Sequence, residues 1–381
     1  MNLAVFSDPA RRVAAVRMFG MYLGAFAVAL GVSGTLVMVT GGSAFEVFQA
    51  LWDGSISSWP SISLTIDESV PVLVVALGII VATRAGIVNI GPEGQLLIGG
   101  LTGAAAAIKL PVPDWMLVPA TLIGAALGGA VWAGIAAVLQ YKSKVDVVIS
   151  TLLLNLVAIQ VVSFAVGRSY LLQENTDASF AAPQSDQIPS AARLPILGTY
   201  GSLRVSSGVF IAIALLVVVG VLVTRSRWGF RLRMLGLNAE AAHRVGIRAA
   251  IVGGGALIVS GATAGLAGGI VLSDRVFRIQ SGFSNNLGYN GLLVALIARR
   301  NPWAAVPAAL LFGVLRAGGG FVSTTGVPRY VVDIMQALIV LAALFPPMLE
   351  EIRARRAARK LALQRANRPT RATAPVLEVA S

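Results

Sequence analysis

The sequence predicts an all-α polytopic membrane protein with about ten membrane-spanning segments, and three observations predict this fold class. First, 56% of the 381 residues are hydrophobic and only 12% are charged, whereas soluble domains carry about 25% charged residues. Second, the apolar residues gather in runs that approach or exceed the length needed to cross a bilayer as helices. Third, basic residues lie mainly in every second interval between these runs, as expected when alternate loops face the cytoplasm, where lysine and arginine are enriched.

The predicted membrane segments follow from these runs in chain order. The first, Met18–Thr40, has 23 residues, or about 35 Å as a helix, and its apolar region is longer than that of a signal peptide. The others are Ser69–Thr83, Gly94–Ile108, Trp115–Leu139, Val147–Val166, Gly208–Thr224, Ala249–Leu272, Gly288–Ile297, Trp303–Gly318 and Tyr330–Leu349. Several are shorter than the roughly 20 residues of a spanning helix. We expect these to be broken or re-entrant, so eight or nine crossings are alternatives to ten.

The charge distribution predicts the orientation. Lysine and arginine number 30 against 17 acidic residues, a formal charge of +13. With ten spans and both termini inside, 22 of the 30 basic residues lie in the cytoplasm, while acidic residues such as Asp67, Glu68 and Asp274 lie outside. The positive charge therefore follows topology, and binding of nucleic acid is not expected.

The same pattern divides the chain into regions. Residues 1–17 are predicted to be a cytoplasmic N-terminus, 18–349 a membrane domain and 350–381 a basic cytoplasmic tail that touches anionic membrane lipid. Within the membrane domain, residues 167–207 form an outer segment without a long apolar run, which we interpret as a lid or docking loop. Residues 225–248 form a strongly basic inner loop.

Several kinds of chemistry are missing from the sequence. It has no cysteine and a single histidine, His243, which excludes thiolate metal sites and leaves little for histidine-based ligation or catalysis. None of the four lysines follows a glycine, so there is no phosphate-binding P-loop. The classes that remain are transport, channel activity, intramembrane catalysis, and structural or sensory roles. We expect no cofactor bound by this chain.

A first motif interrupts the apolar pattern between Arg84 and Gln95. Three glycines and Pro92 make a continuous helix improbable there. Asn89, Glu93 and Gln95 place polar groups where desolvation is costly. One interpretation is a broken helix whose polar groups line a solute path. The other is a tight turn on the inner side, with Glu93 exposed to the cytoplasm or paired with Arg84.

A second motif lies in the basic inner loop, from Gly236 to Ile247. Asn238 is a suitable N-cap, residues 239–245 suit a short helix, and Gly246 can end it. Small residues at 241 and 242 would let another protein approach closely. The alternative is an ordinary amphipathic helix at the membrane surface.

A third motif, Gly288 to Pro302, again joins a glycine start to a short apolar segment and a polar inner end. It echoes the first motif and hints at an internal duplication, with Asn290 as a further polar candidate. The lesser candidates for a pore are Asn155, Gln160, Arg316, Asp333 and Gln336. For these, hydrogen bonds between helices are at least as good an explanation as contact with a solute.

The three motifs together carry a family resemblance. Residues 86–95 resemble a signature of permease subunits of bacterial ATP-binding cassette (ABC) importers of the ribose, branched-chain amino acid and nucleoside type, in the form typical of nucleoside and simple-sugar permeases. Pro92 is a small departure. Residues 236–247 are similar to that family's cytoplasmic coupling helix, and residues 291–302 to its second-half block, with Arg299 and Arg300 replacing the usual glycine and polar residues. The resemblance covers about Phe45 to Pro347.

The resemblance implies a transport subunit rather than an enzyme, in the bacterial inner membrane. Its implied partners are an ATPase subunit that binds ATP and Mg, a second homologous permease in a homo- or heterodimer, and a periplasmic or lipoprotein solute-binding protein. The expected solute is a nucleoside or related sugar. The expected translocation path comprises Asn89, Glu93, Gln95, Asn155 and Asn290; the expected coupling helix comprises Gly236, Asn238, Glu240, Ala241, Ala242 and Gly246.

Two other functions remain open from the residues alone. The first is an ion-coupled secondary transporter that uses Glu93 or Asp333 as its proton or sodium site. The second is a membrane scaffold without transport activity that binds a cytoplasmic partner through the basic loop.

Overall fold

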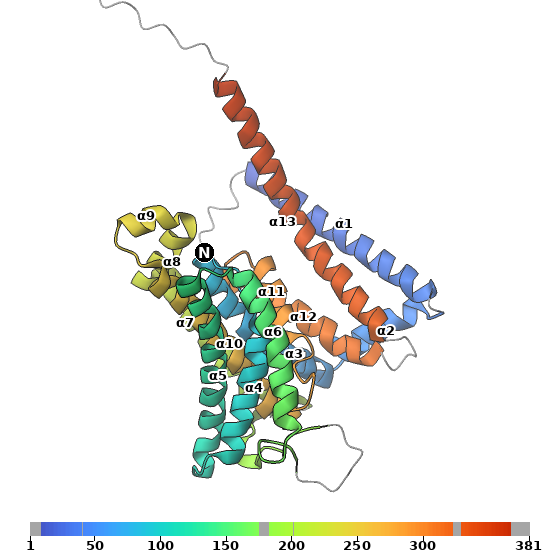
Figure 1. Cartoon of the computed structure of the whole chain (residues 1–381). Coiled ribbons are helices and arrows are strands. Elements are labelled where there is room, and N and C mark those ends of the chain that lie inside the picture. Colours follow the sequence, from blue (N-terminus) through green and yellow to red (C-terminus); the bar gives the residue numbers. More distant parts are fainter. Residues whose placement is uncertain (1–8, 40, 175–182, 201, 323–328, 367–381) are drawn as a thin grey trace, which may run out of the picture. The chain divides into compact units, whose positions relative to one another are not determined.

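The structure, a computed structural model, is mainly helical and describes residues 9–39, 41–174, 183–200, 202–322 and 329–366 (Figure 1). The chain forms two compact units. One unit contains residues up to Leu36 together with those from Asp333 onward, and the other contains Val37–Val332. All three sequence motifs lie in the second unit.

The first unit holds most of helix α1 (Pro9–Val39) and helix α13 (Arg329–Ala366). A salt bridge of 3.6 Å joins Arg17 of α1 to Glu350 of α13. The first part of the predicted basic tail, up to Ala366, is the continuation of α13. Residues 1–8 of the predicted N-terminus and 367–381 of the predicted tail lie outside the described residues.

The second unit contains the remaining elements. Its helices and strands are α2 (Ala44–Ser55), α3 (Trp59–Arg84), α4 (Pro92–Lys109), α5 (Asp114–Ser143), α6 (Val147–Val166), the 3₁₀ turn η2 (Ser190–Ala192), β1 (Ile196–Tyr200), β2 (Leu203–Ser206), α7 (Gly208–Arg225), α8 (Arg227–Leu237), α9 (Ala239–Arg244), α10 (Ala249–Val271), the π-helical turn η3 (Leu272–Val276), α11 (Leu287–Ile297) and α12 (Pro302–Val322). The two strands form an antiparallel hairpin.

The helices confirm the predicted fold class. Eight helices in the described parts of the chain are long and apolar enough to cross a membrane. Of the ten predicted segments, Gly94–Ile108 and Gly288–Ile297 correspond to α4 and α11, which are not among these eight. Eight crossings lie within the expected range. The orientation with both termini inside stays a prediction.

The predicted start of the second membrane segment is wrong. Helix α3 begins at Trp59, ten residues before the predicted Ser69. Hydroxyl groups make this polar start possible, because Ser61 donates a 2.6 Å hydrogen bond to Asp53 O and Thr65 one of 2.8 Å to Ser55 O. Asp67 and Glu68, predicted to lie in an outer loop, therefore lie inside a helix.

Two other elements were not predicted as such. The basic inner loop holds two helices, α8 and α9, instead of one, and the segment at 44–55 is the amphipathic helix α2. The outer segment has the predicted boundaries, since α6 ends at Val166 and α7 begins at Gly208, and the β-hairpin lies within it. Residues 175–182 and 201 of that segment are outside the described residues.

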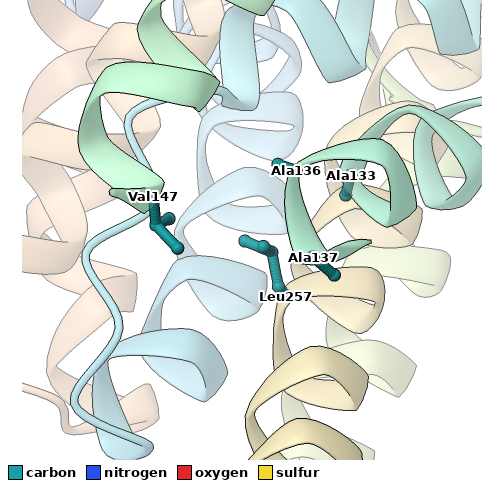
Figure 2. Close-up of a cluster of buried hydrophobic side chains, with 5 residues drawn as sticks. All are labelled: Ala133, Ala136, Ala137, Val147 and Leu257. Carbon is teal, nitrogen blue, oxygen red and sulfur yellow. The ribbon is translucent and has the colours of Figure 1, made fainter. Parts of the chain in front are cut away.

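The core of the second unit is built by α3, α4, α5 and α10, and α8 and α9 lie at one end of this bundle (Figure 1). Small residues bring the helices close: a methyl group on Gly129 of α5 would lie 2.7 Å from Gly265 Cα of α10. Such close contacts replace hydrophobic driving force in membrane helix packing. Figure 2 shows a cluster of side chains from α5, α6 and α10, namely Ala133, Ala136, Ala137, Val147 and Leu257.

Candidate functional site

The first motif forms a non-helical linker between α3 and α4. Helix α3 ends at Arg84, and α4 begins at Pro92, which is favourable in a first helical turn because it has no N–H to leave unpaired. Gly86 has a φ of +78°, a conformation that glycine adopts without strain. Ile87 anchors the linker by packing against the apolar cluster of Figure 2. The predicted break in the helix is confirmed.

Asn89 and Gln95 belong to one buried hydrogen-bond network. The Asn89 amide donates to Gln95 Oε1 and to Ser260 Oγ, each at 3.0 Å, and Asn89 Oδ1 accepts from Gly91 N at 2.9 Å. The exposed fractions of Asn89 and Gln95 are 0% and 1%. This network joins the linker to α4 and to α10, so both side chains hold the linker in place. Their predicted contact with solute stays a prediction.

Asn155 connects α6 to the same region. Its Oδ1 accepts from Gly94 N at 2.9 Å, and its Nδ2 donates to Ile90 O at 2.9 Å and to the Tyr289 hydroxyl at 3.2 Å. One buried amide therefore contacts the linker, the first turn of α4 and the first turn of α11. Such a junction satisfies backbone groups that the interrupted helices leave unpaired.

Glu93 joins the starts of the two short helices α4 and α11. It is buried, and its carboxylate accepts hydrogen bonds from Ser284 Oγ and, at 2.8 Å, from Gly288 N. The helices meet closely here, since a methyl group on Gly288 would lie 2.7 Å from Pro92 C. Arg84 donates instead to Arg300 O at 2.7 and 3.0 Å. The interpretation of Glu93 as exposed or paired with Arg84 is therefore wrong.

A cavity of about 320 Å³ borders Glu93. This volume is at the lower end of the range for small-molecule sites. The cavity is lined by Glu93 and Leu97 of α4, Ile159 and Val162 of α6, and Ser281, Gly282, Ser284, Asn285 and Asn286 of the segment before α11. We call residues 281–286 the cavity loop. Asn290, a predicted path residue, is half-buried on α11 and is not among the lining residues.

An ion-pair network lies beside the cavity loop. Arg316 of α12 donates from Nε to Glu68 Oε2 at 2.7 Å and from Nη1 to Asn285 O at 3.0 Å. Glu68 also pairs with Arg275. The role of Glu68 is not predicted from the sequence, because the polar residues around it are typical of a loop. The available signal was Arg316, since a charge within an apolar helix requires a partner.

The second motif folds nearly as expected. Asn238 caps α9 by accepting a 2.9 Å hydrogen bond from Ala241 N, and Gly246 follows the helix with a φ of +82°. Within the short helix, Ala242 is fully buried, whereas Glu240 and Ala241 are exposed. The proposed contact with another protein can therefore involve Ala241 directly, but not Ala242.

Gly236 connects this segment to the linker. A methyl group at Gly236 would lie 2.9 Å from Gly86 N and 3.1 Å from Ala85 C, so the end of α8 rests on the linker backbone. Leu237 beside it is 81% exposed and Val245 is 66% exposed. Gly236, which contacts the linker that leads to Asn89, is thus followed in the chain by exposed apolar side chains.

Comparison with known proteins places these features in a family. Residues 61–344 match the family described as "Branched-chain amino acid transport system / permease component". The glucose ABC transporter permease protein TsgB13 of Haloferax volcanii is 29% identical over 90% of this chain and 91% of its own length. The guanosine permease protein NupP of Bacillus subtilis is 31% identical over 83% and 90%, and the nucleoside permease protein NupB of Lactococcus lactis is 27% identical over 84% and 87%.

Each of these organisms also has a second permease protein similar to this chain. They are NupQ of B. subtilis, NupC of L. lactis and TsgC13 of H. volcanii, at 27%, 25% and 26% identity.

Proposed function

The chain belongs to the permease family of branched-chain amino acid transport systems and is the permease subunit of an ABC importer, and from this premise we propose which solute it moves and with which partners. We propose that it forms the translocation path for a nucleoside or a related sugar-like solute. The observation that carries the proposal is the cavity of about 320 Å³ beside two helices that begin against each other. Interrupted helices are a recurrent way of building solute sites inside membranes.

The chemistry of the cavity supports a neutral solute. Its polar lining consists of serine and asparagine side chains and Glu93, whose two carboxylate oxygens already accept hydrogen bonds from Ser284 and Gly288. The names of the relatives refer to guanosine, nucleosides and glucose, which are neutral molecules that carry hydroxyl groups. Hydroxyl and amide groups on the protein match such groups in both directions, because each can donate and accept.

The proposed partners follow from the family and from the sequence. The chain has no P-loop, so we propose that a separate ATPase subunit binds ATP and Mg and docks on the surface around Ala241. A second permease is supported by the paired relatives in three organisms. We further propose a periplasmic or lipoprotein solute-binding protein, and a location in the bacterial inner membrane.

The proposed mechanism transmits force from α9 to the cavity. Closure of the ATPase subunits pushes α8 and α9, the contact of Gly236 moves the linker at Ala85 and Gly86, and the linker moves the start of α4. Glu93 then passes this motion to α11. The ion-coupled alternative has less support at Glu93, because each of its two carboxylate oxygens already accepts a hydrogen bond from the protein and fewer lone pairs remain for an ion.

The proposal is tested with Ala241→Trp in proteoliposomes that contain the permease, its ATPase and the other partners. Because Ala241 is exposed, the variant should assemble in the membrane at the normal level. Uptake of labelled guanosine should fall at least tenfold while ATP hydrolysis continues. Ala241→Ser is the matched control and should transport normally. Normal uptake by Ala241→Trp would remove α9 from the coupling pathway.

A further inference from the structure

The cavity loop has an unusual backbone. Asn285 and Asn286 have φ values of +43° and +62°, in the left-handed region. Two consecutive residues other than glycine rarely adopt this conformation, although asparagine tolerates it better than most. Strained backbone persists where the surrounding structure holds it and is frequent at binding sites.

Two carboxylates, the buried Glu93 and the half-buried Glu68, hold this loop. Glu93 accepts from Ser284 Oγ, the side chain before the left-handed pair, and from Gly288 N after it. Glu68 acts through Arg316, which it holds at 2.7 Å and which donates to the Asn285 carbonyl at 3.0 Å. The loop is therefore anchored by α4 on both sides of the pair, and at Asn285 itself by Arg316 of α12, which is paired with Glu68 of α3.

These anchors also give the charged groups beside the cavity hydrogen-bond or ion-pair partners within the protein. Glu93 is engaged by two donors, and Arg316 is paired with Glu68. The cavity-lining polar groups that are exposed belong to Ser281, Asn285 and Asn286. A hydroxyl and two amides offer donors and acceptors without net charge. The arrangement suits a solute with hydroxyl or amide groups and disfavours an anion.

We propose that Asn285 and Asn286 are the specificity-determining residues of the solute path, and that they bind a neutral, hydroxyl- or amide-bearing solute by hydrogen bonds. The inference rests on the proposed function and deepens it. It assigns recognition of the solute to the cavity loop, whereas Asn89, Gln95 and Asn155 hold the linker and the start of α4 in place by hydrogen bonds.

The test removes the amides without disturbing the backbone. Glycine adopts a positive φ without strain, so Asn285→Gly and Asn286→Gly delete the side chains and keep the loop conformation. The complete transporter is reconstituted, and the KM and maximal rate of uptake are measured with labelled guanosine and labelled glucose. Gln49→Ala is the control, because Gln49 carries an exposed amide on α2 that does not line the cavity, and alanine keeps the helix.

We expect each loop variant to raise the KM for the transported solute about tenfold for each hydrogen bond lost. The maximal rate and ATP hydrolysis should stay within twofold of the parent protein. An anionic nucleoside monophosphate should inhibit uptake less than one tenth as strongly as the neutral nucleoside at the same concentration.

Unchanged KM values in both variants, with uptake by the parent intact, would overturn the assignment and leave the proposed function standing. Equal competition by the anion would overturn the neutral-solute inference. If the parent transports neither solute although its ATPase is active, the proposed solute class itself is wrong, and the assignment that rests on it falls as well.

Discussion

Gly288 is the position where the contact between the two short helices is most sensitive to a small change. It lies in the first turn of α11, against the first turn of α4. Replacement by alanine places a methyl group 2.7 Å from Pro92 C, and nearer still to Glu93 N and Cα. An ordinary contact of this kind is at least 3.4 Å. The obstacle is backbone, so the methyl group cannot be accommodated by a change of side-chain rotamer.

The size of the effect follows from this distance. The helices must separate by at least roughly 0.7 Å, which stretches the 2.8 Å bond from Gly288 N to Glu93 to about 3.5 Å. Overpacking costs about 1–3 kcal/mol, and loss of a buried hydrogen bond to a charged group about 1.5–3 kcal/mol. The two effects share one cause, so we expect a total of about 3 kcal/mol.

The assay is the apparent Tm of the purified transporter in detergent, followed by intrinsic tryptophan fluorescence. Gly288→Ala should lower the Tm by several degrees and reduce solute uptake. Gly134→Ala is the matched control: Gly134 lies inside α5, and an added methyl group would meet no atom within 4 Å beyond the neighbouring backbone of its own helix, so the Tm of this variant should be unchanged or higher. Equal Tm values and equal uptake for both variants would refute the close contact of α4 with α11.

Two further predictions concern polar contacts near the site. Glu93→Gln should keep measurable uptake, because the Ser284 hydroxyl can rotate and accept a hydrogen bond from the new amide. Glu93→Ala leaves the buried donors Ser284 Oγ and Gly288 N unpaired and should lower the Tm more than Glu93→Gln does. Complete loss of uptake in a normally folded Glu93→Gln variant would favour an ion-binding role. Arg84→Gln removes two hydrogen bonds to Arg300 O and should lower the number of solute molecules moved per ATP hydrolysed. Arg300 has a φ of +65°, which costs arginine about 1–2 kcal/mol, whereas glycine adopts it without the support of Arg84, so adding Arg300→Gly should restore part of that ratio. No change in the ratio for Arg84→Gln would exclude this contact from coupling.

Elements with complete local signals can be predicted from the sequence. Helix α6 has the predicted bounds, because Asp146 accepts hydrogen bonds from Val148 N and Ile149 N at its start and Gly167 follows its end. The Asn238 cap of α9 was predictable for the same reason. Caps and apolar runs are local, so they can be recognised without knowledge of the fold.

Elements in which distant residues compensate for local polarity cannot be predicted in this way. The start of α3 was missed because its serine and threonine hydroxyls are satisfied by carbonyls of α2, a helix that was itself not predicted. Helix α8 was hidden by its arginines, although Leu232 and Leu235 bury one of its faces.

The candidate site was predicted only in part. The polar residues at 89, 93 and 95 were recognised, but their partners Ser260 and Ser284 are distant in sequence. Asn285 and Asn286 lie in a segment without apolar periodicity, between η3 and α11, so only the folded chain shows that they line the cavity.

The central claim is that this chain moves a neutral solute with energy supplied by separate ATPase subunits. The most direct measurement is uptake of labelled guanosine and labelled glucose by proteoliposomes that hold the complete transporter, with and without ATP and with and without an ionophore. We predict uptake of at least one of these solutes that requires ATP and persists when the ionophore collapses the ion gradient. Uptake that proceeds without ATP and stops with the ionophore would contradict the claim.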